Sequence, residues 1–344
     1  MTKNSDEVAL AIDGGTTNTR ARLLRGDVLV ATASRPVGVR NVAMSGSKAP
    51  LIQAVAECVA EVVQTAGISV RDISLAAASG MITSNVGLCE VPHVLAPAGI
   101  DDLARHVIAA RFPEIGDLEI RMIPGIKTLP ETASQSASVE SLAHTDILRG
   151  EECETFGILS ATDRRSPLCL LLPGSHTKLV HVDTANRITA SFTTVAGELM
   201  QALAERTILA SSIDWPATGP PDWPAIETGG ACARESGLLR GGFAIRLLDV
   251  IAGTERSFRT WFFVGLVVAA DIGDLQRWPR LVPEVPLLVG GREPLRSVYS
   301  FLLRSVWAGA IDVLTDDAVE LSTARGAAAI ARRSQSGEST ARFR

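Results

Sequence analysis

The sequence has few features of a secreted or membrane-bound protein. Its five cysteines are scattered without a CxxC pair, and no basic stretch followed by an apolar leader opens the chain. The longest uninterrupted apolar run, residues 261–270, is about half of what a bilayer requires. We therefore expect a protein of the reducing cytoplasm without a membrane segment, in which residues 261–270 belong to a buried helix.

The chain also lacks a basic stripe. It has 33 lysines and arginines against 38 acidic residues, which gives a formal net charge of −5 at pH 7. Nucleic acid is therefore not an expected partner. An anionic substrate would have to be bound by individual arginines and by backbone amides.

Charged residues make up only 21% of the chain, whereas hydrophobic residues make up 46%. This composition is typical of a folded protein with a large core and not of a disordered one. At 344 residues the chain is long for a single core. Two domains are therefore expected.

Residues 8–24 have the pattern of a strand, a tight turn and a second strand. An apolar run of strand length ends in Asp13, two glycines and two threonines, and an alternating run begins at Thr19. Glycines let backbone amides approach an anion, and threonine hydroxyls add donors. A carboxylate beside such a turn suggests that a cation lies between Asp13 and the anion, as in a magnesium-bound nucleotide.

An ordinary β-hairpin turn is the alternative, since Asp-Gly and Gly-Gly are common turn pairs. A second stretch, residues 168–183, repeats the design, with an apolar strand, a turn containing Gly174 and Ser175, and another strand. Two such hairpins could bind a polyphosphate from both sides. Phosphate chemistry is therefore the leading hypothesis.

The remaining patterns predict alternating strands and helices. Pro50 lies in the first turn of a predicted helix that Gly67 ends, and Pro124-Gly125 is a predicted hinge between domains. Strands are predicted at residues 28–33, 72–79, 118–123, 188–194 and 285–289. Helices are predicted at residues 47–67, 101–110, 197–209, 235–252, 257–272 and 322–332, and from residues 150 and 294. Loops are predicted at residues 35–40, 131–144 and 214–228.

Six stretches in this order resemble the sugar-kinase, actin and heat-shock ATPase superfamily, and within it the 2-dehydro-3-deoxygalactonokinase family. They are residues 12–20 (IDGGTTNTR), 79–87 (SGMITSNVG), 123–125 (IPG), 148–152 (LRGEE), 173–178 (PGSHTK) and 194–199 (TVAGEL). No single stretch is decisive. Their order along one chain makes the resemblance specific.

The resemblance implies an α/β protein of two ribonuclease H-like domains with an interdomain nucleotide cleft. Residues 6–125 would form the N-terminal domain, with the first phosphate hairpin and a sugar-acid loop, and residues 126–334 the C-terminal domain, with the second hairpin and the adenosine site. It further implies an ATP-dependent kinase that uses Mg²⁺ and phosphorylates 2-dehydro-3-deoxy-D-galactonate at its 6-hydroxyl. The partners are then ATP and a small sugar acid, and a homodimer is left open.

Residue by residue, the resemblance implies a nucleotide site and a metal site. Asp13 would hold the magnesium ion, directly or through water. The nucleotide would be bound by Gly14, Gly15, Thr16, Thr17, Asn18, Gly174, Ser175, His176, Lys178, Gly290 and Gly291. A surface lysine at the strand edge is an equal alternative for Lys178.

The resemblance places the catalytic acid in residues 148–152. If a helix begins after Gly150, Glu151 and Glu152 point about 100° apart, so they cannot face a substrate equally. Glu152 shares a face with Phe156 and is favoured as the general base, with Glu151 in support and Asp146 as the next candidate. Alternatively, these acids only complement the helix dipole.

Ser84 and Asn85 are implied contacts to the sugar acid. Its carboxylate needs a cationic partner, for which Arg20, Arg40 and Arg149 are candidates, although each could instead be a solvated surface residue. Three positions depart from the pattern. Pro173 stands where the superfamily usually has an acid, and Cys153 and Glu154 stand where the family tends to have threonine and glutamine, which leaves the exact sugar acid open.

Three alternatives remain. The chain could be a kinase for a related sugar acid, a non-kinase actin-like ATPase switch, or a catalytically silent sugar-acid sensor. No helix-turn-helix or polymerisation segment is evident, which argues against the last two. ATP hydrolysis without added sugar acid would favour the switch, and tight sugar-acid binding without turnover would favour the sensor.

Overall fold

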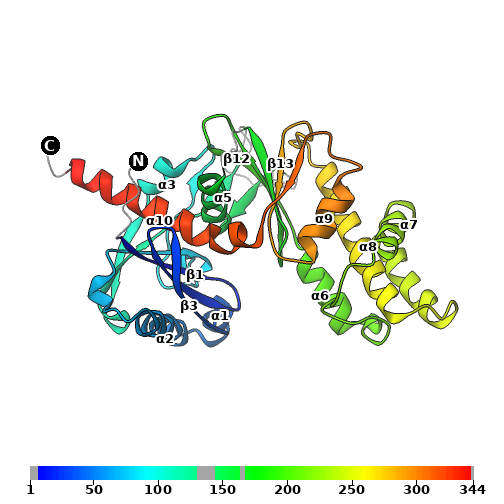
Figure 1. The fold of residues 1–344 in the computed structure, drawn as a ribbon, viewed down its shortest axis with the longest axis horizontal. Helices are drawn as coiled ribbons and strands as arrows, with labels where there is room; N and C mark the ends of the chain where they lie inside the picture. The colour runs from blue at the N-terminus through cyan, green and yellow to red at the C-terminus, as the bar shows by residue number, and fades with distance from the viewer. Residues whose placement is uncertain (1–6, 130–143, 163–166, 342–344) are drawn as a thin grey trace. The chain divides into compact units, whose positions relative to one another are not determined.

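The computed structural model describes residues 7–129, 144–162 and 167–341, and the predicted loop at 131–144 lies almost entirely outside them (Figure 1). By its internal contacts the chain divides into two compact units. Unit 1 comprises residues 1–166, 183–189 and 317–344, and unit 2 comprises residues 167–182 and 190–316. No helix within the described ranges is both long enough and apolar enough to span a bilayer.

Unit 1 is built on a mixed sheet of six strands in the order β3-β2-β1-β4-β7-β6. Strand β2 runs antiparallel to its neighbours β1 and β3, whereas β1, β4 and β7 are parallel. The strands are β1 (Val8–Gly14), β2 (Thr19–Arg25), β3 (Val28–Arg35), β4 (Leu75–Gly80), β6 (Ile108–Phe112) and β7 (Leu118–Met122). A three-stranded sheet of order β5-β8-β9 joins β5 (Val94–Leu95), β8 (Ile126–Thr128) and β9 (Asp146–Leu148).

The two faces of the six-stranded sheet differ in chemistry. Leu10, Ile12 and Leu23 point to one face and pack with the apolar side of α2 (Ala49–Ala66) in a buried core. Asp13 and Arg20, which are cross-strand partners, point to the other face. The alternation of apolar and polar residues along β1 and β2 therefore separates a packing face from a polar face.

The other helices of unit 1 are α1 (Val39–Ser45), α3 (Ile100–Ala104), α5 (Glu151–Ala161) and α10 (Asp316–Ala341). Helices α5 and α10 cross at backbone contact. A Cβ atom on Gly157 would lie 1.7 Å from the Ser322 carbonyl oxygen, and one on Gly326 would lie 1.8 Å from the Cys153 carbonyl oxygen. Only glycine fits at both positions, so the end of the chain is fixed against the middle of unit 1.

Unit 2 contains a five-stranded sheet in the order β12-β11-β10-β13-β14. Its strands are β10 (Leu168–Leu172), β11 (Thr177–Val182), β12 (Ile188–Thr194), β13 (Leu287–Val289) and β14 (Ile311–Val313). Strands β10 and β11 are antiparallel, whereas β10, β13 and β14 are parallel. The first five strands of the unit 1 sheet have the same order when matched strand by strand, so the two units repeat one topology.

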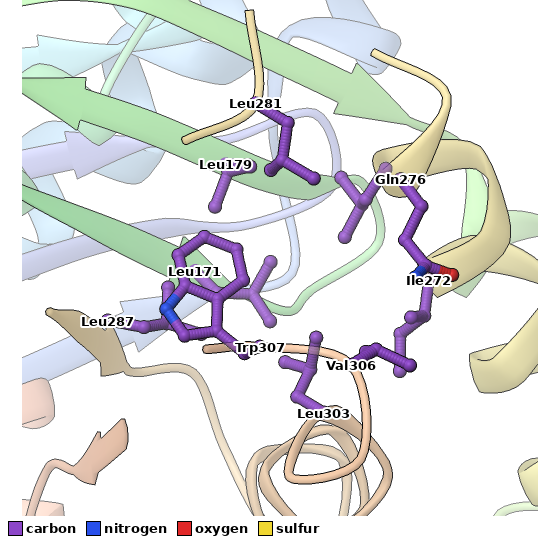
Figure 2. A pocket seen from close by; sticks show the side chains of 10 residues that line it. Leu171, Leu179, Ile272, Gln276, Leu281, Leu287, Leu303, Val306 and Trp307 are labelled. Atoms are coloured by element: carbon purple, nitrogen blue, oxygen red, sulfur yellow. The ribbon is translucent and has the colours of Figure 1, made fainter. Parts of the chain in front are cut away.

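Four helices complete unit 2, namely α6 (Ala196–Arg206), α7 (Trp223–Val250), α8 (Arg256–Gln276) and α9 (Leu295–Leu303). The run predicted to be a buried helix segment lies inside α8 and is buried almost throughout. Between sheet and helices, Figure 2 shows Leu171 and Leu179 facing the helix side chains Ile272 and Leu303 around a cavity. With a volume of about 10 Å³ and a largely apolar lining, this cavity holds at most one water and is a packing defect, not a ligand site.

Several predicted elements differ from the structure. The predicted helix at 101–110 ends at Ala104, and strand β6 begins at Ile108. The final helix begins at Asp316, and α7 begins at Trp223 inside a stretch predicted to be a loop. α7 contains a kink at Gly237, whose φ of 76° is not helical.

The division into units also differs from the predicted change of domain at residue 125. Gly125 accepts a hydrogen bond from the Val94 amide (2.9 Å), and a Cβ on it would lie 2.3 Å from the Leu148 carbonyl oxygen. Because β8 pairs with β5 and β9, the predicted hinge lies inside unit 1. The described residues 126–129 and 144–162 consequently group with the first sheet.

Candidate active site

The first predicted phosphate hairpin is β1 and β2, joined by a four-residue turn. The Gly15 amide donates to the Asn18 carbonyl oxygen (2.8 Å), which closes the turn. Its backbone also accepts hydrogen bonds from the first amides of α1, Val39 to Gly15 (3.2 Å) and Arg40 to Thr16 (3.0 Å). The side chains of residues 16–18 stay exposed. The turn is thus fixed by hydrogen bonds from α1, while its side chains are open to a ligand.

Three glycines meet beside the Asp13 carboxylate. A Cβ atom on Gly80 would lie 2.8 Å from the Gly14 carbonyl oxygen and 3.0 Å from Asp13 Oδ1, and Gly80 has a φ of +82°. A Cβ atom on Gly150, whose φ is +116°, would lie 3.3 Å from the Gly80 Cα. The ends of β1 and β4 and the start of α5 therefore converge on Asp13, which only residues without side chains permit.

Asp13 lies in a charged and poorly hydrated environment. Burial raises the pKa of its carboxyl group, the guanidinium groups of Arg22 and Arg20 oppose this effect, and the Glu151 carboxylate adds to it. Arg22 is only 5% exposed and shares a sheet face with Asp13 and Arg20. Carboxylates gathered in such a place favour a bound cation.

Glu154 is the second acid that α5 brings to this group. Burial raises its pKa to about 8, with further contributions from Glu151 and Asp13 and an opposing one from Arg22. Residues three apart on a helix share a face, so Glu151 and Glu154 approach Asp13 together. Within the described residues, no three His, Cys, Asp or Glu side chains are grouped so that they could hold a metal ion by themselves.

Glu152 points into the interior. It has no exposed surface, and both of its carboxylate oxygens accept the Gly150 amide, at 2.9 and 2.8 Å. Burial, followed by the charge of Glu151, raises its pKa to about 7. Glu151 is half-buried instead, and its Oε2 accepts the Arg149 amide (2.9 Å). The two acids thus diverge as predicted, with Glu152 enclosed and Glu151 nearer the surface.

Arg149 holds the loop between β4 and β5 in place. Its Nη1 donates to the carbonyl oxygen of Thr83 (2.6 Å) and to the hydroxyl of the same residue (2.7 Å), and its Nη2 donates to the Val91 carbonyl oxygen (3.0 Å). His93 lies 3.1 Å from Nη2, and burial and the Arg149 charge lower its pKa to about 4, which keeps the imidazole neutral. This guanidinium is a structural clamp on the loop.

The clamped loop carries both predicted sugar-acid contacts. The Ser84 hydroxyl donates to the Met81 carbonyl oxygen (2.7 Å) and is 7% exposed, so it stabilises the loop. Asn85 is exposed at the tip. Of this pair, only Asn85 presents its side chain to solvent.

The second hairpin in unit 2 has a similar setting. A Cβ on Gly197 at the start of α6 would lie 2.1 Å from the Gly174 carbonyl oxygen, and the Glu198 amide donates to the Ser175 carbonyl oxygen (2.9 Å). On the other side, a Cβ on Gly291 would lie 2.4 Å from the carbonyl oxygen of Pro173. The turn is therefore held between the N-terminus of α6 and the glycine pair after β13, while residues 174–176 stay exposed.

Two predicted nucleotide contacts flank this turn. His176 Nε2 lies 3.5 Å from Glu198 Oε1. Lys178 is only 6% exposed within β11, so it is not a surface lysine. The structure thus places all predicted unit 2 nucleotide residues at one turn and the segments that hold it.

Comparison with known proteins identifies the family. The sequence profile of 2-keto-3-deoxy-galactonokinase matches residues 13–325. The chain belongs to this family. The 2-dehydro-3-deoxygalactonokinase of Escherichia coli K12 is 26% identical over 294 residues, which are 82% of this chain and 85% of that one. The family resemblance predicted from the sequence is confirmed.

Solved structures show the fold that the galactonokinase family shares with other proteins. The crystal structure of a candidate 2-dehydro-3-deoxygalactonokinase from Sinorhizobium meliloti superposes with a TM-score of 0.70 at 21% identity, covering 95% of this chain and 96% of that one. The activator of 2-hydroxyisocaproyl-CoA dehydratase from Clostridium difficile, solved with ADPNP, gives a TM-score of 0.51 at 11% identity and covers 97% of both chains. The α/β fold of the actin-like ATPases and sugar kinases is therefore confirmed.

Sequence reasoning missed two residues of this candidate site, Arg22 and Glu154. Arg22 follows Arg20 by two positions on a strand, and Glu154 follows Glu151 by three on a helix, so each shares a face with a predicted residue. That periodicity was the available signal. Arg20 lies beside Asp13 as a cross-strand partner, whereas Arg40 is exposed at the start of α1 and Asp146 lies in β9.

Proposed function

We propose that this protein transfers the γ-phosphoryl group of ATP to the 6-hydroxyl of 2-dehydro-3-deoxy-D-galactonate. Membership of the 2-keto-3-deoxy-galactonokinase family supports the substrate class. The observation that carries the proposal is a pair of hairpins whose turns pack closely against glycines, in two sheets of the same strand order. The first hairpin lies beside the acidic group around Asp13. Phosphoryl transfer requires mainly positioning and charge neutralisation, which such hairpins supply.

The proposal includes two ribonuclease H-like domains with a nucleotide cleft between them, as the resemblance implies. The repeated strand order, with one antiparallel hairpin followed by parallel strands in each unit, supports it. It also includes a cytoplasmic location, and a homodimer remains an option within it.

The nucleotide would be bound by backbone more than by side chains. The exposed turn at residues 174–176 and the start of α6 offer amides and a helix N-terminus to phosphate oxygens. Gly290 and Gly291 would allow adenine or ribose to lie against the chain. The ADPNP in the Clostridium difficile protein of similar fold is consistent with a nucleotide site in this fold.

Asp13 would hold magnesium together with the phosphate oxygens of the nucleotide. The residues fit this ion, because Mg²⁺ is usually held by one or two carboxylates plus substrate phosphates, and Asp13 supplies one carboxylate beside the turn that would bind the phosphates. When bound, the ion neutralises phosphate charge. The guanidinium groups of Arg22 and Arg20 favour the ionised form of the Asp13 carboxyl group and oppose the effect of burial on its pKa.

We assign the acceptor base to Glu151 instead of Glu152, which the sequence favoured, and we infer that Glu152 positions Glu151. A base must reach the hydroxyl whose proton it takes, and geometry precedes pKa in that choice. Glu152 has no exposed surface and is bonded to the Gly150 amide, whereas Glu151 is half-buried. Glu152 therefore fixes the first turn of α5, from which Glu151 points toward Asp13.

Asn85 is the proposed contact to the sugar acid from the loop that Arg149 clamps. Arg20 is the proposed partner for its carboxylate, because it lies on the same sheet face as Asp13. In this arrangement Arg149 acts through the loop and not by direct contact.

A coupled ADP-release assay over a panel of sugar acids tests the proposal. We expect turnover with 2-dehydro-3-deoxygalactonate to exceed turnover with its epimer 2-dehydro-3-deoxygluconate. Higher turnover with another acid would show that the protein is a sugar-acid kinase with a different substrate. ATP hydrolysis that ignores added acid would contradict the kinase in favour of a switch, and sugar-acid binding without turnover would contradict it in favour of a sensor.

A further inference from the structure

Three polar side chains are buried together beneath the second hairpin. Thr177, Tyr299 and Asp271 are 1%, 0% and 3% exposed. The Thr177 hydroxyl lies 2.9 Å from the Tyr299 hydroxyl, which donates to a carboxylate oxygen of Asp271. These residues come from β11, α9 and α8, so one chain of hydrogen bonds joins the sheet to two helices.

The Tyr299 proton has one arrangement when Asp271 is ionised. A carboxylate only accepts, so the single Tyr299 proton goes to Asp271. The Tyr299 pKa is raised well above its ordinary value by burial and by the Asp271 charge, which keeps that proton on the tyrosine. The Thr177 hydroxyl then donates to Tyr299 or directly to the Asp271 carboxylate, which also interacts with Thr194. The only hydroxyl proton of Thr177 is consequently used inside the unit and cannot serve a phosphate.

The location of Thr177 links these buried hydrogen bonds to the second hairpin. Thr177 is the first residue of β11, directly after the exposed turn at residues 174–176. The side chain faces the helices, as does Leu179 two positions later in the apolar layer around the cavity (Figure 2). Most of its surroundings are therefore apolar, and hydrogen bonds in such surroundings are strong and costly to leave unmade.

We propose that Asp271 and Tyr299 are positioning residues that fix Thr177 and thereby set the turn at residues 174–176 for a nucleoside di- or triphosphate. The inference rests on the proposed function in assigning this turn to phosphate. Gly197 and Gly291 contact the turn on its two sides. The hydrogen bonds of Thr177 to the buried Tyr299 and Asp271 fix it where β11 begins.

Tyr299→Phe tests the proposal, because it keeps the ring and removes only the hydroxyl. We expect the Kd for ADP with magnesium, measured by titration calorimetry, to rise about tenfold. The KM for ATP should rise in parallel, while the KM for the sugar acid stays unchanged. Thr177→Val should weaken ADP binding in the same direction, because it breaks the chain at the turn and leaves the bond between Tyr299 and Asp271.

Val298→Ala is the matched control. Val298 precedes Tyr299 in α9 and is also fully buried, but it is apolar. All five tryptophans of the chain lie in unit 2, so their fluorescence measures the folding of this unit in each variant. At an equal loss of stability, Val298→Ala should leave the Kd for ADP unchanged.

Two results would overturn the inference. One is an ADP affinity that falls equally in Tyr299→Phe and Val298→Ala at matched stability. The other is normal ADP binding by folded Thr177→Val. ADP binding needs no sugar acid, so a wild-type protein that binds ADP but phosphorylates no acid would contradict only the proposed function.

Discussion

Replacing Glu152 by glutamine should change the pH dependence of stability in a defined direction. The carboxyl group has a pKa of about 7 in the folded protein against an ordinary value of 4.5. Between these values the folded state retains a proton that the unfolded state has lost. The contribution of Glu152 to stability is therefore present below pH 4.5, falls as the pH rises, and is fully lost above about pH 7.

The size of this effect follows from the same two values. One pKa unit corresponds to about 1.4 kcal/mol, so ionisation of Glu152 costs about 3 kcal/mol at neutral pH and above. Glu152 has no exposed surface, so solvent does not reduce the figure. Glutamine keeps an oxygen for the Gly150 amide and cannot ionise. The stability of the Glu152→Gln variant therefore lacks this pH-dependent contribution.

Denaturant unfolding of both proteins at several pH values measures the difference. Far-UV circular dichroism follows both units and tryptophan fluorescence follows unit 2 alone, which assigns the affected transition to unit 1. From pH 4.5 to about pH 8, the free energy of unfolding of the wild type minus that of Glu152→Gln should fall by about 3 kcal/mol. A difference that stays constant within about 0.5 kcal/mol would refute the buried-carboxyl reasoning.

Four further changes test the site. Asp13→Asn should lower turnover by orders of magnitude in the ADP-release assay with an unchanged circular dichroism spectrum. Glu151→Gln should slow single-turnover phosphoryl transfer by roughly 10²-fold with ADP affinity unchanged. Gly80→Ala should destabilise the protein by more than about 2 kcal/mol in denaturant unfolding, whereas Gly46→Ala, at a similar positive φ but in open space, should cost about 1 kcal/mol. Arg149→Ala should raise the KM for the sugar acid and increase proteolysis of the loop that it clamps.

Each of these expectations can fail visibly. Activity of Asp13→Asn within a few-fold of the parent would make Asp13 a turn residue. A larger kinetic effect from Glu152→Gln than from Glu151→Gln would return the base to the enclosed acid. Equal losses at Gly80 and Gly46 would remove the steric argument, and an unchanged KM in Arg149→Ala would separate the clamp from the substrate.

The local elements of the fold were readable in the sequence because their causes are local. The turn after Asp13 follows from an apolar run that ends in two glycines. Helix α2 ends at Gly67, because its left-handed backbone conformation favours glycine. The divergence of Glu151 and Glu152 follows from helix geometry alone. The buried run in α8 was likewise predictable, because an apolar run of that length is a local feature of the sequence.

Other features depend on contacts between distant segments. Nothing near Gly125 shows that β8 pairs with β5, because pairing is decided by the partner strand. The strand β6 has only five residues and three exposed side chains, so its pattern is weak. The role of Arg149 as a clamp, and the approach of Glu154 to Asp13, appear only when α5, β1 and the loop after β4 are brought together.

The close crossing of α5 and α10 has a consequence for synthesis on the ribosome. Helix α5 ends at residue 161, and α10 begins at residue 316 after the whole of unit 2 has been made. At about 5–20 residues per second, roughly 8 to 30 s pass between the two. During that time the side of α5 that carries Gly157 lacks its contact with α10. Unit 2 can therefore fold before unit 1 is complete, and this side of α5 is open to chaperones until α10 emerges.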